Sequence, residues 1–257
     1  MILARLTGAF KAQNWFAVAL EFIIVIAGVV IGFQVNAWAE RQDDRARAAL
    51  YLDRLIDDIE ENERRFSDAR DFQASVRDMG EQALDFAAHP DDISDPWRVI
   101  VAYFNAGQAG GTDMVTSTYS ELLATGDLRL FNNVVLRGQL AGYHSQTALR
   151  RITDQLPAYR ESVRGIIPIN YQNHIWAHCY DATYARSQRL VDCASPEIFP
   201  TDDMDRLARR LIEDETLNNE LRYWVSTQFA ALAIHGAQIE SSSVMLATLR
   251  AVRGRPE

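Results

Sequence analysis

The feature that most constrains this chain is an apolar run near its N-terminus, WFAVALEFIIVIAGVVIGFQVNAW, at residues 15–38. Between Phe16 and Phe33 the only charged residue is Glu21, and a tryptophan stands at each end of the run. A helix that rises about 1.5 Å per residue covers roughly 34 Å between the two tryptophans, which matches a hydrocarbon core of about 30 Å with its interfaces. The run predicts one transmembrane helix at 15–38, preceded by a short segment at 1–14.

A cleavable signal peptide is the alternative interpretation of this run. Ala37-Trp38-Ala39 has the small-residue pattern of a cleavage site. The apolar stretch from Phe16 to Phe33 is longer, however, than the roughly 7–15 residues that are usual in a signal peptide. Its length therefore favours a retained anchor.

Inside the predicted membrane helix, small and polar residues share one face. Glu21, Gly28, Gly32 and Asn36 follow one another at helical spacings, with Val25 between them. The two glycines form a G-x-x-x-G pair, which lets another helix approach closely. A carboxylate in hydrocarbon is costly, so Glu21 is expected to face protein, to be protonated or to extend towards the headgroups. We interpret the four residues as a helix-association face; a solitary anchor with incidental glycines is the alternative.

The only two cysteines, Cys179 and Cys193, lie in a region that is rich in prolines and aromatic residues. This spacing favours a disulfide, which stabilises by about 3 kcal/mol and forms in an oxidising compartment such as the bacterial periplasm. The alternatives are unpaired structural thiols and a zinc site made of His174, His178 and Cys193. Zinc is the weaker interpretation because the adjacent residues His178 and Cys179 are poorly placed to bind one tetrahedral ion.

The cellular location follows from these two features together. The basic residues on the two sides of the membrane run nearly balance, so the positive-inside rule does not decide the orientation. The expected disulfide places the bulk of the chain in the periplasm. We therefore predict a single-pass protein of the bacterial inner membrane.

Residues 39–257 predict a helical bundle. Apolar residues recur at three- and four-residue spacings from the membrane run to Pro90 and again from Thr216 to about Val252, and strand-like alternation is almost absent. Asn62, Gln73 and Gly80 occupy seam positions of the first run, which makes it too polar for a strict coiled coil. We predict an all-α fold of about six helices, the first of which continues from the transmembrane helix.

Local signals predict where these helices begin and end, and residues 165–202 predict an irregular region that the disulfide closes. In chain order, the expected signals are an N-cap at Asp95 before Pro96, a capping box of Thr118 and Glu121, a helix stop at Gly126, a cap at Asn132 or Asn133, a kink or restart at Pro157, and a cap at Thr201 or Asp202.

Composition excludes several functions. The chain has 26 basic and 35 acidic residues, a formal net charge of −9, and phosphate neutralisation by a nucleic-acid-binding protein needs a basic surface. The single lysine, Lys11, does not lie in a phosphate-binding loop, a kinase strand or a pyridoxal pocket. No nucleophile elbow, H-E-x-x-H helix or dinucleotide-binding turn is present. We predict no catalytic activity, no cofactor and no nucleic-acid partner.

Two segments of the chain together resemble the motifs of one known family. They are EFIIVIAGVVIGFQVNAWAER at the anchor and TSTYSELLATGDLRLFNNVVLRGQLAGYH in the middle third. On these motifs the chain resembles a family of bacterial single-pass membrane-anchored helical proteins whose activity is uncharacterised. The resemblance implies the architecture but no reaction and no catalytic residues. It also makes Glu21, Gly28, Gly32, Gln34 and Asn36 part of a pattern.

The sequence leaves two functions open. The first is an interaction protein that is held in the lipid bilayer and associates with itself or with another membrane protein through the helix-association face. The second is a periplasmic sensor or small-ligand-binding module that signals through a partner, with a ligand groove near Tyr143 and His144. We predict the first, because the only unusual chemistry of the chain lies in the membrane run.

Overall fold

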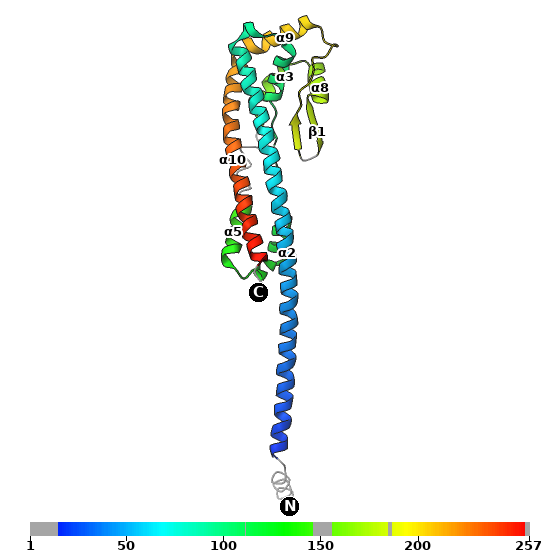
Figure 1. Ribbon diagram of the computed structural model, residues 1–257, viewed down its shortest axis with the longest axis vertical. Helices are drawn as coiled ribbons and strands as arrows, with labels where there is room; N and C mark the ends of the chain where they lie inside the picture. The colour runs from blue at the N-terminus through cyan, green and yellow to red at the C-terminus, as the bar shows by residue number, and fades with distance from the viewer. Residues whose placement is uncertain (1–14, 111, 146–155, 185–186, 255–257) are drawn as a thin grey trace, which may run out of the picture. The chain divides into compact units, whose positions relative to one another are not determined.

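In the computed structural model the described residues are 15–110, 112–145, 156–184 and 187–254. They fall into two compact units, Met1–Tyr51 and Leu52–Glu257 (Figure 1). The elements, in chain order, are α2 (Trp15–Ala88), the 3₁₀ helix η1 (Pro90–Asp92), α3 (Pro96–Ala106), α4 (Ser117–Thr125), the 3₁₀ helix η2 (Asp127–Leu130), α5 (Val134–Ser145), α7 (Ala158–Ile166), α8 (Ile169–His178), the strands β1 (Tyr180–Tyr184) and β2 (Ser187–Leu190), α9 (Thr201–Glu213) and α10 (Glu215–Arg253).

The all-α prediction is confirmed, although the described residues hold more helices than expected. Helix α7 starts directly after Pro157, as the restart signal indicated. Residues 165–202 are only partly irregular: they contain the end of α7, helix α8, a β-hairpin and the start of α9, whereas residues 191–200 lie in no helix or strand. The sequence of α8 shows no clear helical spacing of apolar residues, because only Tyr171 and Ile175 of its ten residues are buried.

The first unit contains the apolar stretch of α2. Within the described residues, α2 is the one helix that is long and apolar enough to cross a membrane, and none of its most apolar window is buried. Its large side chains are exposed, as Phe22 at 66% and Ile31 at 62% illustrate. The apolar N-terminal helix is thus present as predicted.

In the second unit, helix α10 lies antiparallel to residues 52–88 of α2 (Figure 1). Gly80 of α2 faces Leu221 and Val225 near the start of α10. Towards the other end, Glu60 pairs with Arg250 at 2.7 Å. Exposed ion pairs of this kind add little stability, so apolar packing and the close approach at Gly80 hold the two helices together.

Residues 107–110 and 112–116, which lie in no helix or strand, contact the buried face of α2 through polar side chains. The amide of Asn62 donates to the carbonyl oxygen of Val115 at 3.0 Å and accepts from the Val115 N–H at 2.6 Å. Gln73 donates to the carbonyl oxygen of Gly110 at 3.0 Å. The seam residues that were too polar for a coiled coil therefore satisfy the backbone of a segment that has no ladder of its own.

Three of the predicted local signals are confirmed. The Asp95 carboxylate accepts from the N–H groups of Trp97 and Arg98 at the start of α3. Asn133, rather than Asn132, accepts from the first N–H groups of α5. Gly126 ends α4 in the left-handed region at φ 75°, where glycine is favoured.

Two predicted caps are wrong, because distant or backbone groups take their place. In α4 the capping box of Thr118 and Glu121 does not form: Asp58 of α2 accepts from the Thr118 N–H at 3.0 Å, and Glu121 pairs with Arg54 at 2.6 Å. Helix α9 begins at Thr201 without a side-chain cap from Thr201 or Asp202. The Pro200 carbonyl accepts its first N–H bonds instead.

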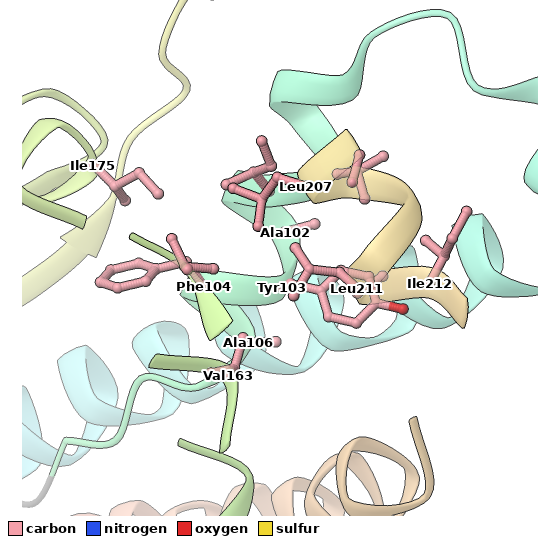
Figure 2. Packing of buried hydrophobic residues seen from close by; sticks show 14 of the residues in the cluster. Ala102, Tyr103, Phe104, Ala106, Val163, Ile175, Leu207, Leu211 and Ile212 are labelled. Atoms are coloured by element: carbon pink, nitrogen blue, oxygen red, sulfur yellow. The ribbon is translucent and has the colours of Figure 1, made fainter. Parts of the chain in front are cut away.

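The core of the second unit surrounds α3, most of whose residues are buried. Figure 2 shows Ala102 and Tyr103 of α3 beside Leu207 and Leu211 of α9, and all four belong to one buried cluster. Within it, the Tyr103 hydroxyl donates to Asn218 at 2.6 Å. Such burial of apolar surface is the main source of stability in this unit.

Gly80 of α2 supplies the first test. A Cβ at Gly80 would lie 2.4 Å from Cγ2 of Val225, so Gly80→Ala is expected to destabilise the protein by about 1–3 kcal/mol through overpacking. The matched control is Gly138→Ala in α5, where an added Cβ meets nothing within 4 Å and helix propensity adds up to about 1 kcal/mol. Urea unfolding of the full chain in detergent measures both, and equal stabilisation of the two variants would contradict the close approach of α10.

Candidate functional site

The predicted helix-association face lies on α2 within the first unit. At about 100° per residue, Glu21, Val25, Gly28, Gly32 and Asn36 fall within roughly 80° of the helix circumference. All five side chains or Cα positions are exposed in the single chain. The face is therefore a continuous narrow stripe, about 22 Å long from Glu21 to Asn36.

The two glycines leave a shallow strip along this stripe. A Cβ built on Gly28 or on Gly32 meets no atom within 4 Å. Val25 next to them is 59% exposed. Nothing in the described part of the chain covers the strip, and its shape suits the close approach of a second helix backbone.

The polar members stand near the two ends of the stripe. The Asn36 amide donates to the Glu40 carboxylate at 2.9 Å, one turn further along α2, and its carbonyl oxygen is an acceptor. Glu21 is exposed. These groups offer hydrogen bonds to a neighbouring helix, which in hydrocarbon add to close packing of small residues.

The two cysteines form the predicted disulfide. Cys179 and Cys193 are bonded with their Cα atoms 5.1 Å apart. Cys179 directly precedes β1, whose residue Tyr180 pairs with Leu190 of the antiparallel strand β2. The bond thus closes the base of the hairpin, and Cys179 is fully buried in the core.

The zinc alternative is wrong, since a disulfide sulfur is not the thiolate that binds zinc. Cys193 is bonded to Cys179. His174 and His178 do lie together, with ring centroids 4.3 Å apart, but His174 packs against the edge of Trp97. No group of three or more metal-binding side chains occurs among the described residues.

The residues of the predicted ligand groove, Tyr143 and His144, are 3% and 8% exposed. The His144 ring stacks on Tyr119 of α4 with centroids 4.2 Å apart, and the Tyr143 hydroxyl lies 2.9 Å from the Ser242 hydroxyl of α10. Burial lowers the pKa of His144 to about 4, against a smaller raising effect of Asp58. The pair is part of the packing between helices.

Comparison with protein family models, with curated proteins and with solved structures finds no match to this chain. The chemistry of its side chains therefore carries the functional argument.

One cluster was missed by the sequence reasoning. Arg160 and Arg164 stand one turn apart on α7 and meet Gln108, which lies after α3. The only local signal was an arginine pair at i, i+4, a spacing that is destabilising for like charges.

The disulfide gives a direct test. Alkylation of the unreduced protein in urea is expected to modify no thiol, and reduction to expose two, because both cysteines of the chain are bonded. Replacing both cysteines by serine should lower the free energy of unfolding by about 3 kcal/mol. Reductant should then have no further effect on the double variant. Two reactive thiols before reduction would contradict the bond.

The buried histidine gives a pH test. His144 binds a proton near pH 6.5 in the unfolded chain but only near pH 4 in the folded protein. The free energy of unfolding is therefore retained above pH 6.5 and decreases as the pH falls towards 4. His144→Phe should flatten this loss by on the order of 3 kcal/mol. His89→Phe, at an exposed position, is the control and should keep the wild-type pH profile of urea unfolding.

Proposed function

We propose that this protein is a single-pass component of the bacterial inner membrane that associates with itself or with another membrane protein through α2. Residues 15–38 are its anchor, and the helical unit Leu52–Glu257 is the part held at the membrane surface. The contact is the stripe of Glu21, Gly28, Gly32 and Asn36.

The observation that carries the proposal is the uncovered glycine strip in an apolar helix. Gly28 and Gly32 have no atom within 4 Å of an added Cβ, and large apolar side chains flank them. In lipid, helices gain little from hydrophobicity alone, so association depends on close packing and hydrogen bonds. A G-x-x-x-G pair with a carboxyl group and an amide on the same face supplies both.

The carboxyl group of Glu21 adds a second argument. In hydrocarbon a lone carboxyl group is costly, and its cost falls when a neighbouring helix offers a hydrogen-bond partner. A partner helix that packs against Gly28 and Gly32 also lies next to Glu21, because all three residues share one face of α2. The same pattern of residues is the one that resembles the membrane-anchored family.

The disulfide supports a periplasmic position for the second unit. Such bonds persist in oxidising compartments and are rare in the bacterial cytosol. Cys179–Cys193 closes the hairpin inside the core of that unit. The single apolar helix then holds the unit on the outer side of the inner membrane.

Leucine substitutions on the stripe test the proposal. Gly28→Leu with Gly32→Leu should reduce crosslinked or co-purified partners from native membranes by about fivefold or more, since filling the strip removes on the order of 1 kcal/mol of packing. The matched control, Ala19→Leu with Ala27→Leu, also introduces two leucines at exposed positions away from the stripe and should leave association unchanged.

Two results would overturn the proposal. Equal association of the stripe variant and the wild type would remove the role of the glycines. A native protein that begins near residue 39 and is found in the water-soluble fraction would show that the apolar run is a cleaved signal peptide.

A further inference from the structure

Two arginines in the second unit have no acidic partner among the described residues. Arg160 and Arg164 of α7 are both half-buried. Arg160 donates to the carbonyl oxygen of Gly107 at 2.7 Å and to the side-chain oxygen of Gln108 at 3.0 Å, and Arg164 reaches that same oxygen at 3.3 Å. Each guanidinium has five N–H donors, so most of their donors are not used by these bonds.

Aromatic rings hold the second guanidinium in place. The central carbon of Arg164 lies 5.1 Å from the Phe104 ring centroid and 5.2 Å from that of Trp176. The two rings meet edge to face, with centroids 5.6 Å apart. Cation–π contacts of this kind offset part of the desolvation of a buried cation and fix its orientation.

The charges around the pair are unbalanced. Burial lowers the pKa of both groups, and the neighbouring charge of Arg160 helps to lower the pKa of Arg164 to about 10. The opposing influence comes from Tyr180, and no carboxylate among the described residues contributes. Because both guanidiniums stay protonated near neutral pH, two positive charges share the Gln108 oxygen without a counter-ion from the described part of the chain.

A buried amide completes the cluster. Gln108 is 2% exposed and uses its oxygen for both arginines. Its side-chain nitrogen is buried and has no hydrogen-bond partner among the described residues, and the same holds for Nε of Arg164. Buried donors are nearly always paired in native proteins, so unused donors beside two cations point to an acceptor that binds there.

We propose that Arg160, Arg164 and Gln108 form a binding site for an oxyanion, the phosphate or carboxylate group of a small molecule. Guanidinium groups bind both anions with paired, charge-assisted hydrogen bonds. The anion offsets the repulsion between the arginines and accepts from the unused donors. This site is independent of the membrane-helix contact, since it is built from the second unit alone.

Anion titration of the full-length protein in detergent tests the site. Calorimetry with sodium phosphate and with sodium acetate, each against sodium chloride at equal ionic strength, should show saturable binding of at least one oxyanion and none of chloride. The anion that binds identifies phosphate or carboxylate as the preferred group. Arg160→Gln and Arg164→Gln should each raise its Kd by about tenfold or more.

The matched control is Arg209→Gln, which removes one positive charge from an exposed position of α9 and should keep the wild-type Kd. Absence of binding by the wild type overturns the proposal. An equal loss of affinity in the Arg209 variant also overturns it, because that result would assign binding to overall charge.

A second variant keeps the test decisive if loss of an arginine impairs folding. Gln108→Glu places a carboxylate within reach of both guanidiniums, so it should raise the melting temperature and abolish the response to the binding anion. A Gln108→Glu protein that still binds the anion with wild-type affinity contradicts the site.

Discussion

The second unit depends on polar side chains that sit on the buried face of a helix. Residues 107–110 and 112–116 lie in no helix or strand, so their backbone groups need partners once they are packed against α2. Asn62 supplies both a donor and an acceptor to Val115, Gln73 supplies a donor to Gly110, and Arg65 supplies one to Asp113. Because Asn62 is fully buried, these bonds are shielded from water and define the path of the segment from the α3 core to α4.

The same dependence explains which local signals could be predicted from sequence. Asp95 and Asn133 cap helices that begin one residue later, so their partners lie within three positions and the sequence reveals them. The capping box of Thr118 failed because its N–H is bound by Asp58, sixty positions away. The hairpin within residues 165–202 was not predicted for a related reason. Strand pairing and a disulfide define it, and neither produces a periodic pattern of apolar residues in the sequence.

The candidate sites divide in the same way. The stripe of Gly28 and Gly32 could be predicted because the face of a helix depends only on spacing, and the disulfide because Cys179 has one available partner in the chain. The arginine cluster could not be predicted. Its third member, Gln108, lies 52 positions before Arg160, and only the packing of α7 against the end of α3 brings them together.

The glycines of this chain differ in what surrounds them, and this difference supports the proposed contact. Gly80 is explained within the molecule, since Val225 occupies the space of a side chain. Gly138 is open, but its helix belongs to the second unit, where water fills such a space without cost. Gly28 and Gly32 are open within an apolar stretch, and under the proposed function the strip they leave faces lipid or another helix. Each glycine costs about 1 kcal/mol of helix propensity relative to alanine; in the proposed contact, close packing against a second helix offsets this cost.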